Sequence, residues 1–325
     1  MTILVAALVS ALLTRGLLAL AARGSALIPL DRPNQRSLHV RAVPRAGGLA
    51  VLATFLLLAG RQAAHIDGLL AGLAIVAAVS YFDDLRGLSP GIRLAAHLAA
   101  SIIVAWALSG SAWALLVALC IAGFANIVNF MDGANGVVAG CMAIAFAVLG
   151  QVGLLTPSPG LAELSFALAG AAAGFLVLNL SGRIFLGDAG SVSLGFLYAA
   201  LSAFGFHAGV WPLEPCILAV LPMLIDALST LVRRAIRRQH IWLPHREHLY
   251  QRLIECGWSH RRVAVSYGLA TLVAGGLGLL TLHAANETRI GVVLAAGTVA
   301  LAIHDYGLRC CARKRRAAPA NDTDA

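Results

Sequence analysis

Long apolar runs, broken only by short groups of charged residues, Pro or Gly, cover most of this 325-residue chain. A helix needs about 20 apolar residues to cross a hydrocarbon core of about 30 Å. Lipid offers no partner for backbone polar groups, so spanning segments must be helices or a closed barrel. The runs lack the polar and apolar alternation of barrel strands. The pattern therefore predicts an all-α, polytopic membrane helix bundle.

Eleven predicted spans share this apolar character: 3–22, 47–62, 68–82, 94–109, 112–130, 136–155, 164–182, 191–209, 215–232, 263–282 and 290–307. Several are short, so ten spans is the alternative count. The composition agrees, because only 12% of the residues are charged, against about 25% in soluble domains. A cleaved signal peptide is the alternative for the first span, but residues 1–14 contain no basic residue, so we expect a retained helix.

The distribution of basic residues predicts the orientation. If the spans alternate from an external N-terminus, 21 of the 24 Lys and Arg residues fall in internal segments and only Arg61 and Arg289 in external ones, with Arg15 inside the first span. Basic residues favour the cytoplasmic side, so we expect a periplasmic N-terminus, a cytoplasmic C-terminus and location in a bacterial inner membrane. The net charge of +9 then describes one face, which suits anionic lipid and phosphate-bearing substrates rather than nucleic acid.

The same segmentation predicts one transmembrane catalytic domain over residues 1–308. Its cytoplasmic loops are expected at 23–46, 83–93, 131–136, 183–190 and 233–262. Residues 309–325 are basic and then polar, which is typical of a disordered tail. The external connections are short, so function is expected on the internal face.

Five aspartates gather at the internal ends of the predicted spans: Asp83, Asp84, Asp132, Asp188 and Asp226. The first three fall at helix C-termini, where the macrodipole places about half a negative charge and disfavours carboxylates. Positive charge should therefore compensate them. Asp226 lies about two turns inside the ninth span, where an unpaired carboxylate is costly, and needs a partner such as Arg233 or a water-filled cleft.

Two sources of positive charge are open for Asp83 and Asp84. Arg86 and Arg93 are close in sequence and supply it in the simpler interpretation. A divalent cation supplies it in the other, because Mg²⁺ takes one or two carboxylates together with substrate phosphates and water. Carboxylates from separate helices at one membrane depth suit such a metal–diphosphate site.

The segment Phe185–Ser191 opens the eighth span and has two compatible interpretations. Asp188 or Ser191 could simply cap the helix. Alternatively, Gly187 and Gly190 let backbone N–H groups approach a phosphate while the Asp188 carboxylate holds a metal. In the turn between the fifth and sixth spans, residues 126–136 carry amides and a carboxylate, and Asn135 could be only a helix N-cap.

The loop from Arg233 to Arg262 holds the densest cluster of cationic and aromatic side chains. One interpretation is an interfacial amphipathic helix, opened by Pro244, ended by Gly257 and carrying an apolar stripe that includes Leu249 and Tyr250. That helix does not account for the His and Arg residues beside Pro244. These suit recognition of phosphates or sugar hydroxyls, and both interpretations can hold together.

Seven motifs in order resemble the polyprenyl-phosphate N-acetylhexosamine-1-phosphate transferase superfamily, glycosyltransferase family 4. They are Asp31-Arg-Pro-Asn-Gln-Arg-Ser-Leu-His39, Pro44-Arg-Ala-Gly-Gly48, Phe82-Asp-Asp-Leu-Arg-Gly-Leu88, Asn126–Gly136, Phe185–Ser191, Pro222–Asp226 with Arg233-Arg234, and Pro244–Leu253. The resemblance spans most of the chain. It implies a cytoplasm-facing active site among ten or eleven helices, a UDP-N-acetylhexosamine donor, undecaprenyl phosphate as acceptor, and Mg²⁺, with Mn²⁺ as an alternative.

The resemblance also implies roles for individual residues. Asp83 or Asp84 would deprotonate or position the lipid phosphate, and Asp132 would join them as a catalytic residue. Asp188, with Asp84, would bind the metal. The remaining residues would bind substrate: Asn126, Asn129, Asn135, His245, Arg246, His248 and Arg45.

Two positions depart from the family pattern. The family often has a second Asp where this chain has Asn135, and its His-x-His element here reads His248-Leu-Tyr250, which weakens a strict histidine-triad assignment. The Tyr-containing variant is similar to the branch that initiates O-antigen or capsule synthesis. The resemblance leaves open the amino sugar, the glycan pathway, a homodimer and a covalent intermediate.

The expected reaction is attack of the lipid phosphate on the β-phosphorus of the donor, giving a lipid-diphosphate sugar and UMP. Positioning and charge neutralisation dominate such phosphoryl transfer. The rival from another class is a membrane transporter or lipid flippase without transferase chemistry. A transporter would place its ionisable groups near the bilayer midplane and often shows inverted repeats, whereas here the acids gather at one face and no internal repeat is evident.

Overall fold

The computed structural model describes residues 1–31, 42–240 and 245–317, which are almost wholly helical. The helices are α1 (Thr2–Ala22), α2 (Gly47–Ala63), α3 (Leu69–Arg86), α4 (Pro90–Ser109), α5 (Trp113–Met131), α6 (Val137–Leu155), α7 (Pro159–Asn179), α8 (Asp188–His207), α9 (Leu213–Leu218), α10 (Leu221–Ile236), α11 (Leu249–Glu255), α12 (His260–Leu280) and α13 (Asn286–Ala317). A two-residue antiparallel pair, β1 (Leu30–Asp31) and β2 (Val43–Pro44), precedes α2.

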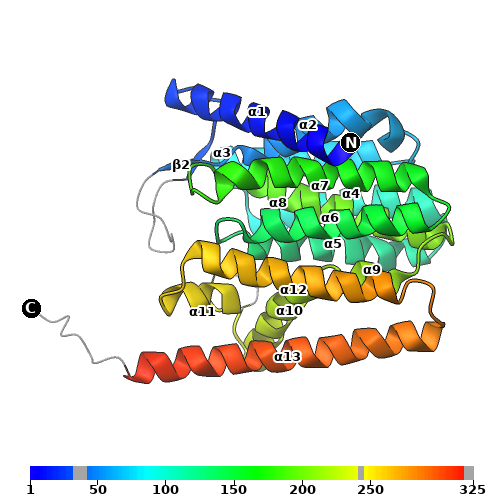
Figure 1. Cartoon of the computed structure of the whole chain (residues 1–325). Coiled ribbons are helices and arrows are strands. Elements are labelled where there is room, and N and C mark those ends of the chain that lie inside the picture. The colour runs from blue at the N-terminus through cyan, green and yellow to red at the C-terminus, as the bar shows by residue number, and fades with distance from the viewer. Residues whose placement is uncertain (32–41, 241–244, 318–325) are drawn as a thin grey trace, which may run out of the picture.

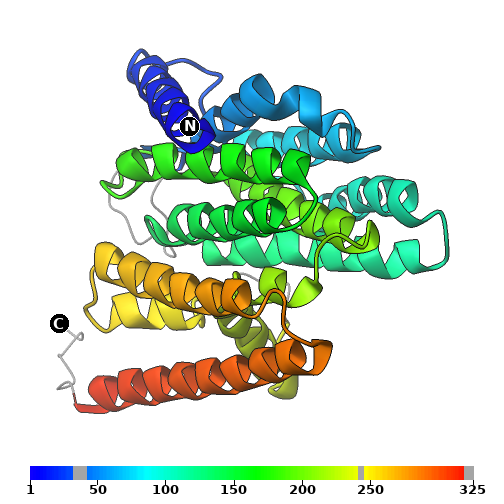
Figure 2. The same ribbon diagram turned by 45° about the vertical axis from the view of Figure 1, so that its right-hand side comes forward.

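The helices form one bundle in which α6, α7 and α8 are the most enclosed (Figure 1). Helix α7 packs against α6, α1 and α2, and α8 packs against α5 and α3. Both views place α1 and α13 at opposite edges of the bundle (Figures 1 and 2). The core is built from apolar side chains such as Phe146, Phe175 and Phe196, all fully buried.

Each of the eleven predicted spans overlaps a helix of the structure, so the all-α prediction is confirmed. Within the described residues, eight helices are long and apolar enough to cross a membrane, namely α1, α4, α5, α6, α7, α8, α12 and α13. The chain is therefore a multi-pass membrane protein. Many side chains on the outside of the bundle are large and apolar, for example Leu57, Trp113 and Val177, as expected of a surface that faces lipid.

The ninth predicted span is not one helix. The chain forms α9, breaks at Ala219 and Val220, and continues as α10, with Pro222 in the first turn of the second helix. Proline lacks an N–H and clashes with the preceding turn, so it starts a helix more readily than it continues one. The broken element leads α10 toward α13 at the edge of the bundle.

Two other boundaries correct the sequence-based expectations. The short helix in the 233–262 loop begins at Leu249 rather than at Pro244, which lies outside the described residues, and it ends before Gly257 (φ +91°) as expected. The last helix continues to Ala317, so residues 309–317 are helical rather than disordered. Residues 32–39 of the first family motif and 318–325 of the tail also lie outside the described residues.

Candidate active site

Hydrogen bonds join the predicted internal loops at one end of the bundle. The start of α8 contacts the end of α3, because the Asp188 N–H donates to Asp84, and it contacts α5, because the Ser191 hydroxyl donates to Asn129. The turn after α5 contacts α12 through Asn135 and His260. Residues from 83–93, 131–136, 183–190 and 245–260 therefore share one polar end.

Backbone pairing places Arg45 in this end of the bundle. The Phe185 N–H donates to the Pro44 carbonyl (2.8 Å), and the Gly47 N–H donates to the Phe185 carbonyl (2.9 Å). Arg45 and Phe185 thus form an isolated parallel bridge. The pairing satisfies backbone groups that would otherwise be buried without partners, and it sets Arg45 beside the start of α8.

Glycine allows the two backbones to meet just beyond this bridge. A Cβ added to Gly48 would lie 2.2 Å from the Cα of Gly190, and one added to Gly187, whose φ is +75°, would lie 2.8 Å from an Asp84 carboxylate oxygen. Side chains do not fit at such distances, and a positive φ favours glycine. The Gly residues in the second and fifth motifs are therefore required by packing around the site.

Asp84 caps α8 from another helix. Its Oδ1 accepts a hydrogen bond from the Asp188 N–H and its Oδ2 accepts one from the Ala189 N–H, both at 3.1 Å. The side chain is fully buried, and Arg45 Nε lies 3.3 Å from Oδ1. A carboxylate at a helix N-terminus meets free N–H donors and the positive end of the dipole. The cap expected from Asp188 or Ser191 is thus supplied by Asp84.

Asp83 and Asp188 share a second arginine. Arg93 Nη1 lies 2.8 Å from Asp83 Oδ2 and 3.4 Å from Asp188 Oδ2, while Arg45 Nη2 lies 3.0 Å from Asp188 Oδ1. The side chain of Asp188 keeps 14% of its surface exposed and that of Asp83 keeps 8%. Of the two arginines expected to compensate these carboxylates, Arg93 does so, whereas Arg86 forms no ion pair within the described part of the chain and Arg45 takes its place.

Asp132 completes a group of four carboxylates. It is the C-cap residue of α5, and its carboxylate has no hydrogen-bond or ion-pair partner among the described residues. Burial raises the pKa of Asp132 well above its ordinary range, with Asp188 and Asp84 adding to the shift. Burial lowers the pKa of the Arg45 guanidinium, but the surrounding carboxylates outweigh it and the net shift is upward.

The charge of this cluster suits a divalent cation. Four carboxylates, Asp83, Asp84, Asp132 and Asp188, lie beside two guanidinium groups, so the fully ionised cluster carries an excess of two negative charges, which a divalent cation would offset. All the candidate ligands are oxygen atoms, which Mg²⁺ and Mn²⁺ prefer. Within the described chain no three His, Cys, Asp or Glu side chains are gathered as a ready coordination group. Donor chemistry and net charge therefore fit the ion, while the arginines stand between the carboxylates.

The predicted amide residues take different positions. Asn129 Oδ1 accepts a hydrogen bond from the Ser191 hydroxyl (2.8 Å), which links α5 to the start of α8. Asn126 donates to the Ala122 carbonyl (2.7 Å) and lies 3.4 Å from His97 Nδ1. Asn135 is not the N-cap of α6, since Gly136 holds that position. The Asn135 N–H donates to His260 Nδ1 (3.2 Å).

The predicted phosphate-binding loop packs against the same turn. His248 is 2% exposed, and its ring stacks on Phe130 with centroids 6.4 Å apart and lies 4.9 Å from the ring of His245. Burial, followed by the charges of His248 and Arg234, lowers the pKa of His245 to about 4. His245 is therefore neutral at pH 7. Arg246 lies between the two histidines in the chain and is half-buried.

Tyr250 holds the Asp132 turn, a role that the sequence did not indicate. Its hydroxyl donates to the Phe130 carbonyl (3.0 Å) and accepts from the Gly133 N–H (3.1 Å), so it brackets Asp132. A Cβ on Gly133 would lie 2.3 Å from that oxygen. The residue that departs from the family's His-x-His pattern is thus a structural partner of a candidate catalytic carboxylate.

Asp226, in α10, caps the N-terminus of α11. It accepts hydrogen bonds from the N–H groups of Leu249 (2.7 Å) and Tyr250 (3.1 Å), and from the Tyr267 hydroxyl (2.6 Å), and His304 Nε2 lies 3.4 Å away. Arg233 donates instead to Thr230, so the suggested Arg233 partner is wrong. Asp226 is a buried helix cap shared by α10, α11, α12 and α13.

Comparison with known proteins places this fold and site in a class. Residues 66–205 match the model of glycosyl transferase family 4. The decaprenyl-phosphate N-acetylglucosaminephosphotransferase of Mycobacterium tuberculosis is 31% identical, over 83% of this chain and 80% of its own. The probable undecaprenyl-phosphate N-acetylglucosaminyl 1-phosphate transferase of Bacillus subtilis is 28% identical, over 71% of each chain. The undecaprenyl-phosphate alpha-N-acetylglucosaminyl 1-phosphate transferase of Escherichia coli K12 is 25% identical, over 77% of this chain and 76% of its own.

These matches cover the polar end from α3 to α8 and most of the remaining bundle. The chain belongs to the polyprenyl-phosphate N-acetylhexosamine-1-phosphate transferase superfamily, as its motifs indicated.

Proposed function

We propose that this protein transfers a sugar-1-phosphate of the N-acetylhexosamine type from a UDP-sugar to undecaprenyl phosphate, releasing UMP and starting a cell-envelope glycan such as O-antigen or capsule. The observation that carries the proposal is the cluster of four aspartates and two arginines at one end of a membrane bundle. The relatives named above carry out prenyl-phosphate sugar-phosphate transfer by name. The basic residues that flank this end favour its placement at the cytoplasmic face of the inner membrane.

The accessible members of the cluster suit the reacting groups. Asp83 keeps part of its surface exposed beside Arg93, so we assign it to position or deprotonate the lipid phosphate while the guanidinium offsets the phosphate charge. Arg45 offers a second cation at the start of α8. Phosphoryl transfer gains mainly from such positioning and charge neutralisation.

The two predicted metal ligands differ in accessibility. Asp188 keeps 14% of its side chain exposed, whereas Asp84 is fully buried and caps α8. We therefore assign Asp188 to hold Mg²⁺ or Mn²⁺ together with Asp132, which has no partner within the described ranges, and Asp84 to orient the helix start that presents Asp188. The bound ion would supply positive charge against the donor diphosphate.

The amides, His245, Arg246 and His248 are assigned to the donor. Asn129 lines the α5 side of the site, with Asn126 one turn before it on the same helix, and His245, Arg246 and His248 lie across the Asp132 turn. Asn135 lies on the far side of that turn. A neutral His245 serves as a hydrogen-bond partner rather than as a cation at pH 7.

Release of UMP tests the function directly. Purified protein in detergent is incubated with undecaprenyl phosphate, Mg²⁺ and each of several UDP-N-acetylhexosamines, with and without chelator. We expect UMP release that requires the lipid and the metal. Folded protein that releases no UMP from any donor but moves lipid or solute across proteoliposomes would support the transporter alternative instead.

Single carboxylate variants test the assignments. Asp188→Asn is expected to abolish metal-dependent turnover while the protein stays folded and membrane-inserted, because the variant loses the charge that holds the ion. Asp67→Asn, at an exposed position between α2 and α3, is the matched control and should retain wild-type turnover. Asp188→Asn with unchanged activity and metal requirement would refute the assignment.

A further inference from the structure

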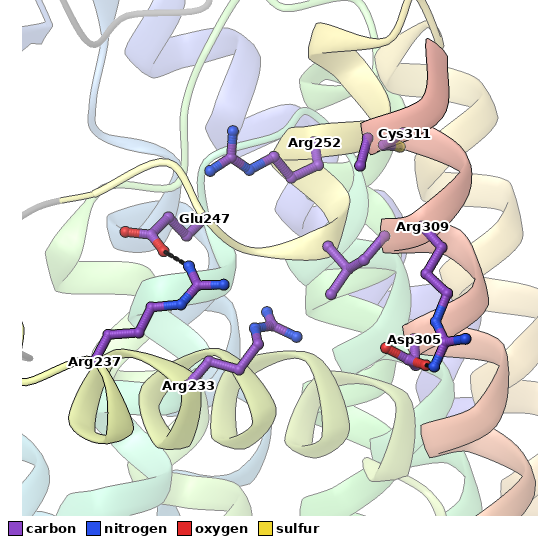
Figure 3. A pocket seen from close by; sticks show the side chains of 9 residues that line it. Arg233, Arg237, Glu247, Arg252, Asp305, Arg309 and Cys311 are labelled. Carbon is purple, nitrogen blue, oxygen red and sulfur yellow. Dashed lines mark ion pairs between the residues drawn. The ribbon is translucent and has the colours of Figure 1, made fainter. Parts of the chain in front are cut away.

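A basic pocket lies between α10, α11 and α13, apart from the aspartate cluster. It has a volume of about 410 Å³, and its lining residues are Arg233, Arg237, Glu247, Arg252, Asp305, Leu308, Arg309, Cys311 and Ala312. None of the candidate catalytic aspartates lines it. Helix α10 packs against α5 and against α13, and Figure 3 shows the labelled lining residues coming from α10, the segment before α11, α11 and α13.

The pocket carries more positive charge than its own carboxylates offset. Four arginines and two carboxylates line it, so two positive charges remain. Both carboxylates are already engaged, since Asp305 pairs with Arg309 at 2.6 Å and Glu247 pairs with Arg234 and, at 3.9 Å, with Arg237. An added anion is the direct way to balance the remaining charge.

Two of these arginines are placed to receive an anion. The Arg233 side chain donates to the Thr230 hydroxyl (2.9 Å) and has no ion pair among the described residues. Figure 3 shows its guanidinium pointing from α10 into the space beneath α11. Arg252 lines the same pocket from α11 and forms a 3.5 Å pair with Glu255. Two arginines that line one pocket from separate helices suit the oxygens of a phosphate.

The position of the pocket identifies the source of the phosphate. It lies where the apolar parts of α10 and α13 give way to arginines, which is the depth of lipid headgroups. Leu308 and Ala312 form its apolar side, and α13 exposes Leu294 (66%) and Leu301 (49%) on the same helix face, 14 and 7 residues before Leu308. A diacyl lipid can therefore lie along α13 with its headgroup in the pocket and its acyl chains against these apolar side chains. A soluble phosphate has no apolar part that could contact them.

We propose that the pocket between α10, α11 and α13 is a binding site for an anionic phospholipid, separate from the sites of the transferred substrates. Arg233 and Arg252 hold the headgroup phosphate, with Arg309 and Arg237 at the rim. Bound lipid joins α13 to α10 and α11. This lipid binding does not depend on whether the transferase reaction is the one proposed above.

Native mass spectrometry of the delipidated full-length protein in neutral detergent tests the site. Phosphatidylglycerol and phosphatidylcholine with identical acyl chains are titrated separately, and glycerol 3-phosphate serves as a soluble competitor. We expect phosphatidylglycerol to bind at least about tenfold more tightly than phosphatidylcholine, and the Arg233→Gln/Arg252→Gln variant to lose about 30-fold in that affinity. Arg313→Gln, an exposed α13 position outside the pocket, is the control and should bind as wild type.

Three results would overturn the proposal. These are equal binding of the two lipids, unchanged phosphatidylglycerol binding by the double variant, and displacement of the lipid by an equal concentration of glycerol 3-phosphate, which would show a phosphate site without lipid specificity. If the double variant does not fold, each single variant is measured in its place. A single variant is expected to lose about fivefold in affinity.

Discussion

The hydroxyl of Tyr250 brackets Asp132, so removing that one oxygen tests whether the turn matters for turnover. Tyr250→Phe keeps the buried ring and deletes the hydrogen bonds to the Phe130 carbonyl (3.0 Å) and the Gly133 N–H (3.1 Å). Each neutral hydrogen bond contributes about 0.5–1.5 kcal/mol, so the turn loses about 1–3 kcal/mol of local support. If that energy holds Asp132 in its reactive position, kcat falls by about 5- to 150-fold.

The assay separates positioning from general stability. UMP release gives kcat and KM for each variant, and thermal unfolding in detergent gives Tm. We expect the loss in kcat with KM changed by less than about threefold, because the substrate-contacting side chains remain. Tyr306→Phe, at a tyrosine that is 69% exposed, is the matched control. A Tyr250→Phe protein with wild-type kcat and only a lower Tm would refute the positioning role.

Three further predictions concern the packing and charge around the site. Gly48→Ala should lower Tm and activity together, because the new methyl group would meet the backbone of Gly190; unaltered Tm would contradict this. Asp226→Asn should cost about 3–5 kcal/mol of stability, since α11 loses a charged cap and buried donors lose their partner, as denaturant unfolding would show. Arg45→Lys should reduce kcat by about tenfold or more, because lysine cannot reach both Asp84 and Asp188 as the guanidinium fork does; kinetics equal to wild type would dismiss that role.

The helices could be predicted from sequence because lipid imposes one solution on long apolar runs. The same rule failed where local chemistry intervened, as at Pro222, which divides the ninth predicted span into α9 and α10. The C-terminal boundary at residue 309 also failed. The basic residues there suggested a tail, yet α13 continues through Arg309, whose side chain pairs with Asp305 one turn earlier.

The sequence predicted which residues gather at the polar end of the bundle, but not which of their side chains contact one another. The alternation of spans brings the aspartates to one end without saying which carboxylate meets which cation. Asp84 and Asp188 are 104 residues apart, and only the packing of α3 against α8 turns Asp84 toward the amides of α8. The partners of Asp226 and Tyr250 likewise come from other helices. In the sequence, Asp226 was marked only as an acid that is costly to bury, and Tyr250 only as a departure from a family motif.

The carboxylate–guanidinium cluster has a consequence for biosynthesis. Arg45, Asp84 and Arg93 are made early in the chain, and Asp188 and the α8 amides that Asp84 caps come about a hundred residues later. A chain whose second half has not yet entered the membrane therefore lacks Asp188 and the start of α8, although the other five members of the cluster are already made. The charged centre is complete only once α8 has been inserted. An unfinished chain therefore has no assembled centre that could bind a phosphate-bearing substrate.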